Sequence, residues 1–296
     1  MTMLRVSPYE QFNSPRKDQA CVSSGRKRTG FLLALLLGIG TAMSSFFASD
    51  ASAQSSTGEL KVISENIEAG IKETRFDIEV DGVIVPGILW TPEGAEGTRP
   101  LVVFGHGGRQ HKRVSNILRM ARDLVSNEHY AVMAIDGFGH GDRAAANEAE
   151  RRDRAEENMT AESMAAIDAV QKLSYVGEGP IGYWGVSMGT RFGVPLVAAD
   201  SRFKAAVFGL FGLFPEGSTV PVGWGDDARS ITVPLIFVYQ RSDTLMTLQN
   251  GIDLFDAFGS TEKAMHINPG GHTAIPVSER EKWKPFFVSH LGKARL

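Results

Sequence analysis

A serine between two glycines is the residue whose neighbours most suggest chemistry. Ser187 stands in "IGYWGVSMGTRFG" (181–193), with Gly185 two positions before it and Gly189 two positions after it. The apolar run ahead of Ser187 predicts a strand, and the residues after it predict a helix. On so tight a turn the two glycine positions have no room for a Cβ, and the serine hydroxyl is exposed on a strained backbone. Because this short pattern also arises by chance, Ser187 needs partners elsewhere in the chain to be a nucleophile.

The first partner required is a base, since a serine hydroxyl is a poor nucleophile until a neighbouring group takes its proton. Of the seven histidines, His272 in "NPGGHT" (268–273) is the candidate. It follows the last predicted strand, and the two glycines before it give its loop the freedom to reach back over the serine. The alternative for a lone loop histidine is simple exposure to solvent, but this position favours the catalytic role.

The second partner is an acid that orients the imidazole and stabilises its charged form. Asp243 in "YQRSDTL" (239–245) lies a few residues past a predicted strand. Asp226 and Asp227, which follow the preceding strand, are the alternatives. We therefore expect Asp243 to contact His272.

Backbone N–H groups that hold the developing oxyanion are the third requirement. Met188, at the start of the predicted helix, would supply one donor, and Gly108 in "HGGR" (106–109) would supply the other. His106 in the same loop could be catalytic, but we interpret it as a buried residue that braces the loop.

The elements that must position these residues alternate between strand and helix. A hairpin centred on Asp81-Gly82 is predicted over 74–93 by its alternating polarity. Strict alternation of strands and helices indicates an α/β fold with a mostly parallel sheet, helices on both faces and the antiparallel hairpin at one edge. Residues 144–158 are alanine and charge, which is typical of a solvated helix face, with a mobile lid as the alternative. The predicted buried strands lie at 100–108, 130–143, 181–187, 203–213, 234–243 and 264–272, and the helices at 117–125, 161–173, 248–258 and 279–291.

The chain from about 74 to 292 resembles α/β-hydrolases, nearest to the dienelactone hydrolase and prolyl-oligopeptidase-like esterase branch. The segments that carry the resemblance are "FGHGG", "AIDGFGHGDR", "GYWGVSMG", "YQRSD" and "PGGH". The resemblance implies Ser187 as nucleophile, His272 as base and Asp243 as acid, in the chain order of this fold, with Gly108 and Met188 as oxyanion donors. Dienelactone hydrolases proper use a cysteine nucleophile, and many relatives have a second glycine where this chain has Thr190, so the resemblance is weaker for substrate than for fold.

Apolar residues near this sheet edge suggest an apolar substrate pocket. We interpret most of the aromatic residues at the end of the strand 203–213 as core. Trp224, which glycines flank in the predicted loop 215–232, is the better candidate for a substrate wall, together with Phe211. Arg109 and Arg241 lie beside the oxyanion and acid loops and would favour an anionic substrate, or are simply solvated.

The N-terminus is a different kind of sequence. A basic cluster at 26–28 is followed by an apolar stretch from Phe31 to about Met43 and by Ala51-Ser52-Ala53. This is the pattern of a signal peptide (1–53) cleaved before Gln54, followed by a polar lead-in (54–72) and a hydrolase domain (73–296). The apolar stretch is shorter than the roughly 20 residues that a membrane-spanning helix needs, so an uncleaved anchor is the less favoured alternative. We expect an exported protein, periplasmic or extracellular, without stable membrane insertion.

Composition excludes other classes of function. The formal net charge of −3 argues against nucleic acid as a partner. No cysteine or histidine spacing indicates a metal, and no cofactor is implied. The sequence therefore predicts a carboxylic ester hydrolase that forms an acyl-enzyme on a small-molecule ester. A serine peptidase or amidase of the same fold and a non-catalytic binding protein remain the alternatives.

Overall fold

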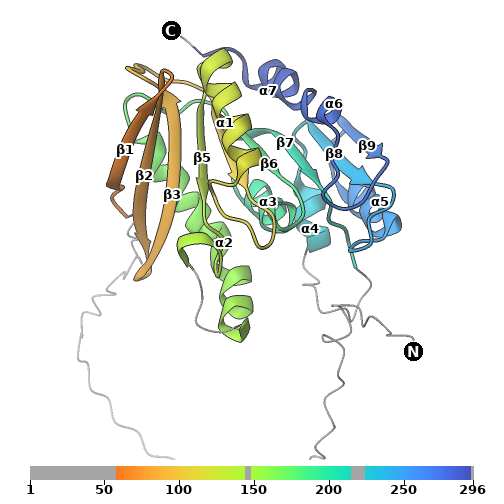
Figure 1. The fold of residues 1–296 in the computed structure, drawn as a ribbon. Coiled ribbons are helices and arrows are strands. Elements are labelled where there is room, and N and C mark those ends of the chain that lie inside the picture. The colour runs from red at the N-terminus through yellow and green to blue at the C-terminus, as the bar shows by residue number, and fades with distance from the viewer. Residues whose placement is uncertain (1–57, 144–147, 215–223, 295–296) are drawn as a thin grey trace, which may run out of the picture. The chain divides into compact units, whose positions relative to one another are not determined.

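The predicted α/β sheet is present (Figure 1). The computed structural model describes residues 58–143, 148–214 and 224–294. The predicted signal peptide and the first residues of the lead-in lie outside the described residues. Within them the sheet has the strand order β1-β2-β3-β5-β4-β6-β7-β8-β9. The strands are β1 (Lys61–Glu68), β2 (Ile71–Val80), β3 (Val83–Pro92), β4 (Leu101–Gly105), β5 (Ala131–Ile135), β6 (Ile181–Gly185), β7 (Phe203–Gly209), β8 (Leu235–Gln240) and β9 (Lys263–Asn268).

Most of the sheet is parallel, as predicted. From β5 through β4, β6, β7 and β8 to β9, each neighbouring pair is parallel, whereas β1, β2 and β3 join the edge antiparallel. The carboxyl ends of the parallel strands therefore meet at one edge of the sheet, where ligand sites of such folds form.

The predicted hairpin around Asp81-Gly82 is confirmed. Asp81 and Gly82 have φ values of 49° and 78° and connect β2 to β3 directly. Positive φ at both central residues is the geometry of a type I′ turn, whose twist matches that of the flanking strands.

Strand β1 was not predicted, because its residues were interpreted as part of a lead-in without structure. All eight of its residues are exposed, so no alternation of buried and exposed positions marks the strand in the sequence. β1 is the edge strand and is defined by its backbone hydrogen bonds to β2, and such bonds leave no trace in a hydrophobic pattern.

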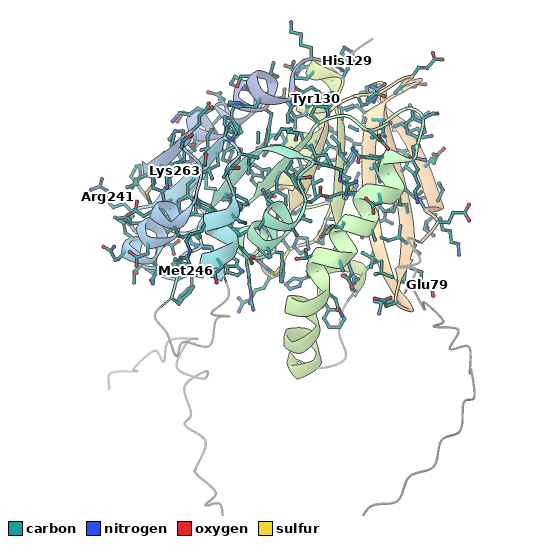
Figure 2. The ribbon with its side chains drawn as sticks, turned by 180° about the vertical axis from the view of Figure 1, so that it is seen from behind. Glu79, His129, Tyr130, Arg241, Met246 and Lys263 are labelled. Atoms are coloured by element: carbon teal, nitrogen blue, oxygen red, sulfur yellow. The ribbon has the colours of Figure 1, made fainter. Side chains whose placement is uncertain are left out.

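Helices cover both faces of the sheet, so there are two cores. One core joins the sheet to α1 and α7, which lie in front of the sheet in Figure 1. The other joins it to α2, α3, α4 and α5, and Figure 2 shows α2 across that face from behind. The helices are α1 (Ser115–Glu128), α2 (Glu148–Gln171), α3 (Met188–Ala199), α4 (Trp224–Ser230), α5 (Leu248–Ala257), α6 (Val277–Arg280) and α7 (Trp283–Leu291).

The helix expected for the alanine- and charge-rich run is confirmed from Glu148 onward, while 144–147 lie outside the described residues. It continues into the helix predicted at 161–173 as one long helix, α2. The predicted loop 215–232 holds the helix α4 from Trp224 onward, and its first part, 215–223, is outside the described residues. Trp224 begins α4 and is buried.

Among the described residues, no helix combines the length and apolarity that crossing a membrane requires.

Candidate active site

The turn between β6 and α3 holds Ser187 in a strained conformation. Ser187 has φ 58° and ψ −121°, values rarely adopted by a residue with a side chain. A Cβ added to Gly189 would lie 2.4 Å from the Gly105 carbonyl oxygen, and one added to Gly185 would lie 2.8 Å from the backbone of Gly189. Both glycines are therefore required by close backbone approach, as the sequence indicated.

Thr190 stabilises this turn, a role that the sequence reasoning missed. Its hydroxyl is fully buried and lies 2.9 Å from the Gly185 carbonyl oxygen and 2.6 Å from that of Gly209. The hydroxyl also accepts a hydrogen bond from the Gly209 N–H at 2.8 Å, and the Ser187 N–H donates to the Gly209 carbonyl at the same distance. These bonds tie the turn to the end of β7.

His272 contacts both of the other residues predicted for the site. Its Nε2 lies 2.9 Å from Ser187 Oγ, and its Nδ1 lies 2.6 Å from Asp243 Oδ2. The imidazole is 13% exposed and the Asp243 carboxylate 1% exposed. Three residues separated by 85 and 29 positions are thus in one hydrogen-bonded row.

Asp243 is held in place by its own loop. Its Oδ1 accepts hydrogen bonds from the N–H groups of Leu245 and Met246, at 2.8 and 3.2 Å. These bonds leave Oδ2 free to face the imidazole. Asp226, by contrast, lies on α4 with its carboxylate 86% exposed and paired with Arg229. The structure therefore brings Asp243, and not the alternative on α4, to His272.

The loop after β4 carries Gly108 and is braced by His106. His106 Nδ1 donates to the Gly107 carbonyl at 2.9 Å, and Nε2 accepts from the Gly137 N–H at 2.9 Å. Burial lowers the pKa of His106 to about 4, so the ring is neutral at pH 7. Among the described residues, the Gly108 N–H donates to no protein acceptor. Met188 is the first residue of α3, where backbone N–H groups have no acceptor within the helix.

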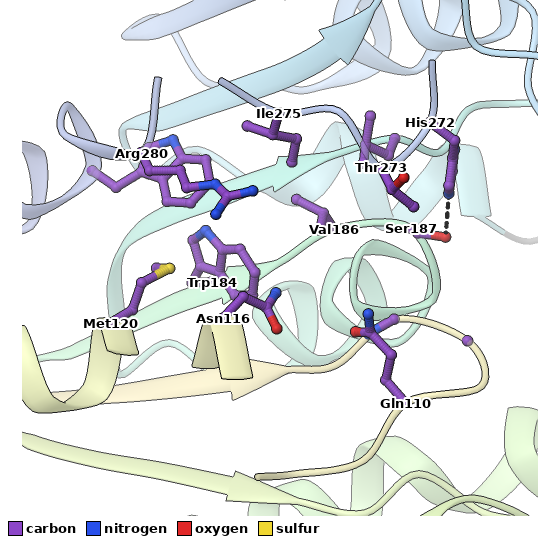
Figure 3. Close-up of a pocket in the computed structure, with 14 residues that line it drawn as sticks. Gln110, Asn116, Met120, Trp184, Val186, Ser187, His272, Thr273, Ile275 and Arg280 are labelled. Carbon is purple, nitrogen blue, oxygen red and sulfur yellow. Dashed lines mark hydrogen bonds between the residues drawn. The ribbon is translucent and has the colours of Figure 1, made fainter. Parts of the chain in front are cut away.

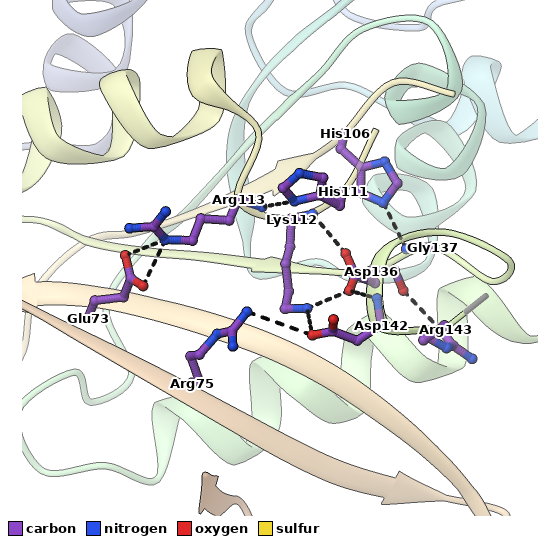
Figure 4. Close-up of polar contacts among 10 residues, drawn as sticks. All are labelled: Glu73, Arg75, His106, His111, Lys112, Arg113, Asp136, Gly137, Asp142 and Arg143. Atoms are coloured by element: carbon purple, nitrogen blue, oxygen red, sulfur yellow. Dashed lines mark hydrogen bonds and ion pairs between the residues drawn. The ribbon is translucent and has the colours of Figure 1, made fainter. Parts of the chain in front are cut away.

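A buried ion pair fixes the same loop to the turn after β5 (Figure 4). Lys112 Nζ donates to Asp136 Oδ2 at 2.5 Å and to Asp142 Oδ2 at 2.7 Å, and the Lys112 N–H donates to Asp136 Oδ1. The hydrogen bond from Lys112 lowers the pKa of the Asp142 carboxyl. Arg143, which ends the short 3₁₀ turn η2 (Gly141–Arg143), donates to the Asp136 carbonyl and pairs twice with Glu162 of α2. Buried charges arranged in this way are stabilised by each other and restrict movement of the loop.

Comparison with known proteins assigns this geometry to a family. No family model matches the sequence. The solved structure of a PEG-bound, cold-adapted esterase from an Arctic intertidal metagenomic library is 34% identical to this chain. The two superpose with a TM-score of 0.68 over 77% of this chain and 97% of that one. This chain belongs to the α/β-hydrolases. It is a carboxylic ester hydrolase.

Two further comparisons find a partial sequence match and a likeness of fold. A Bacillus subtilis (strain 168) protein named "Putative hydrolase YtaP" is 30% identical over 141 residues, 41% of this chain and 46% of that protein. The match thus spans less than half the length of that relative. Est1E from Butyrivibrio proteoclasticus, solved with ferulic acid bound, has a TM-score of 0.59 at 17% identity, over 73% of this chain and 99% of that one. At such low identity the likeness shows the fold alone.

A pocket of about 120 Å³ opens beside Ser187 and His272 of the hydrolase. Its wall comes from the core on the α1 and α7 face, because Trp184, Leu210 and Trp283 belong to that core. Figure 3 shows Ser187 and His272 at one end of the pocket. The lining residues are Gly107, Gly108, Gln110, Asn116, Met120, Trp184, Val186, Ser187, Leu210, His272, Thr273, Ile275, Arg280 and Trp283.

Neither Trp224 nor Phe211, the predicted substrate wall, lines this pocket. Both are at least 93% buried in the opposite core, with their ring centroids 4.9 Å apart. Phe211 follows Leu210 directly, and the two side chains enter the cores on opposite faces of the sheet. Trp184, three residues before Ser187, was a usable signal for the wall of this pocket, whereas Asn116 and Trp283 are distant in sequence and gave none.

Arg109 and Arg241 do not line the pocket either, and a different arginine, Arg280, does. No group of three or more histidine, cysteine, aspartate or glutamate side chains within the described ranges could hold a metal ion.

Proposed function

We propose that this hydrolase cleaves esters through an acyl-enzyme formed on Ser187. His272 Nε2 takes the proton of the Ser187 hydroxyl as Oγ attacks the ester carbonyl carbon. The oxygen that becomes negative is held by the N–H groups of Gly108 and Met188. The protonated His272 then gives its proton to the leaving alkoxide, and the carbon–oxygen bond of the ester breaks.

The second half of the reaction repeats these steps with water. His272 takes a proton from water, the resulting hydroxide attacks the acyl carbon, and the proton returns to Ser187 Oγ as the acid leaves. Asp243 accepts the Nδ1 hydrogen of His272 throughout, which fixes the tautomer and stabilises the imidazolium.

One observation carries the proposal: His272 lies between two partners, 2.9 Å from Ser187 Oγ and 2.6 Å from Asp243 Oδ2. Each distance is that of a hydrogen bond, and together they leave one imidazole nitrogen to act on the serine and one to be oriented. The strained backbone of Ser187 is further support, because strain of this kind is typical of functional turns.

The test is Ser187→Ala. The variant should fold normally and lose ester hydrolysis by several orders of magnitude, since no other nucleophile stands at the turn. Hydrolysis of short p-nitrophenyl esters and labelling by a fluorophosphonate measure it. Turnover equal to wild type would refute the proposal.

We also propose that the enzyme is exported and starts at Gln54 after cleavage. The support is the basic, apolar and small-residue pattern of residues 26–53. A cleaved chain would lack Cys21, the one cysteine of the sequence, so the exported hydrolase would depend on its core without disulfides.

A further inference from the structure

The end of the pocket away from Ser187 is polar, although its middle is apolar. Figure 3 shows Arg280, Trp184 and Asn116 at that end, with Ser187 and His272 at the other. Trp283 also lines the pocket. These four residues come from α6, β6, α1 and α7.

Three polar atoms of these residues are buried without a hydrogen-bond partner. They are Trp184 Nε1, Trp283 Nε1 and Asn116 Oδ1. Both indoles are only 2% exposed. Buried polar groups in native proteins are nearly always hydrogen-bonded, and each exception needs an explanation. The two indole N–H groups are donors, so an anionic ligand would supply their missing partners, whereas Asn116 Oδ1 is an acceptor and would need a donor.

The charge of this end is positive. Among the described residues, no carboxylate forms an ion pair with Arg280, and none of the residues that line the pocket is acidic. Burial, with a smaller effect of the nearby cation of Arg119, lowers the pKa of the Arg280 guanidinium, which nevertheless stays protonated. Unpaired indole N–H groups next to a guanidinium form a set of donors, and such a set favours an anion.

The size and the middle of the pocket limit what carries that anion. A volume of about 120 Å³ is below the roughly 300 Å³ at which drug-sized ligand pockets begin. Val186, Leu210 and Ile275 line the pocket with apolar side chains. The part of the ligand that enters the pocket is therefore a short chain. Its apolar part lies in the middle of the pocket, and its charged group lies at the end near Arg280.

We propose that this pocket binds a carboxylate at the end of a short chain of the ester substrate, through Arg280 and the indole N–H groups of Trp184 and Trp283. The inference rests on the proposed function, because the carboxylate is placed relative to Ser187. The substrates are then half-esters of short dicarboxylic acids, or esters whose short alcohol part ends in a carboxylate.

Two matched pairs of esters test the proposal and separate these two sources of the carboxylate. Monomethyl glutarate is compared with methyl pentanoate for the acyl side, and 4-acetoxybutanoate with butyl acetate for the alcohol side. In one pair, kcat/KM should be at least about tenfold higher for the charged ester, as expected for hydrogen bonds to a charged group. Arg280→Gln should reduce that ratio to near one, and Arg280→Lys should retain part of it.

The matched control is Arg122→Gln. Arg122 lies on the exposed side of α1, is paired with Glu68 and does not line the pocket. Its replacement by glutamine therefore removes the same charge from the protein and leaves the pocket unchanged. This variant should keep the wild-type ratio. If the neutral ester of both pairs is preferred, or if Arg280→Gln leaves the ratio unchanged, the pocket is not a carboxylate site.

A binding measurement separates this proposal from the proposed mechanism. Glutarate should bind to the Ser187→Ala protein in calorimetry, and Arg280→Gln in the same background should weaken that binding at least about tenfold. Retained hydrolysis by Ser187→Ala would overturn the mechanism. The binding result would then still show whether the pocket binds a carboxylate. Equal glutarate binding with and without Arg280 would overturn the carboxylate site and leave the mechanism in place.

Discussion

At the scale of single residues, replacing Asp243 should disturb the orientation of His272 without disturbing the fold. Asp243→Asn retains an oxygen for the N–H groups of Leu245 and Met246, but its amide favours the wrong tautomer of His272. We predict that kcat falls by about 10⁴ while the unfolding transition stays near that of wild type. Steady-state kinetics and thermal unfolding of the purified variant check this.

Asp226→Asn and Asp227→Asn are the controls for that prediction. Both residues lie on α4, away from His272, so each variant should lose less than about tenfold in kcat. A larger loss from either of these than from Asp243→Asn would move the acid to α4.

His106 gives the enzyme a pH-dependent stability. Its pKa is about 4 in the folded protein, below its ordinary value of 6.5, because it is buried as a neutral ring. Between these two values the unfolded chain binds a proton that the folded chain does not, so stability is complete above pH 6.5 and falls as the pH falls toward 4.

We predict that His106 accounts for about 2 kcal/mol of the stability lost between pH 7.5 and pH 5. Urea unfolding of wild type and His106→Asn at both pH values measures it, since the variant should be less stable at pH 7.5 and less sensitive to pH. Identical pH dependence in the two proteins would mean that folding does not shift the pKa of His106.

At the scale of elements, the contact of α3 with β4 depends on Gly189. A Cβ at this position would meet the Gly105 carbonyl oxygen of β4, a backbone atom that cannot move alone. Helix propensity favours alanine over glycine by about 1 kcal/mol, but overpacking costs about 1–3 kcal/mol. We predict that Gly189→Ala is destabilised in urea unfolding and loses activity, because α3 must shift and Ser187 with it.

Gly225 on α4 is the matched control. A Cβ there meets only the end of the Arg229 side chain, at 3.3 Å, and this flexible side chain can move away. Gly225→Ala should therefore have unchanged or slightly increased stability. If Gly189→Ala were the more stable of the two variants, helix propensity, and not the close approach of the Gly105 backbone, would determine the effect of a substitution at Gly189.

At the scale of the whole molecule, the proposed export gives a prediction about the mature chain. Ala51 and Ala53 are small residues at the −3 and −1 positions of a cleavage site, so the exported protein should begin at Gln54. N-terminal sequencing of enzyme from the extracytoplasmic fraction tests this. Full-length chain found only in the cytoplasm would contradict it.

The sequence by itself determined what depends on local backbone geometry. The turn at Ser187 needs glycine at two fixed offsets, the hairpin needs Asp81-Gly82, and buried parallel strands are continuous apolar runs. Strand ends in such a sheet meet at one edge, so Ser187, Asp243 and His272 could be named together, and they lie within hydrogen-bonding distance. These constraints are local, so a few neighbouring residues in the sequence are enough to reveal them.

Only the tertiary structure decided on which face of the sheet the pocket beside Ser187 forms. An apolar pattern says that Phe211, Trp224 and Trp184 are buried, but not against which helices, and the pocket formed on the side of Trp184. Strand β1 is held by backbone bonds that no side-chain pattern records. The polar end of the pocket joins residues from four separate elements, because packing brings Asn116, Trp184, Arg280 and Trp283 together across more than 160 positions of chain.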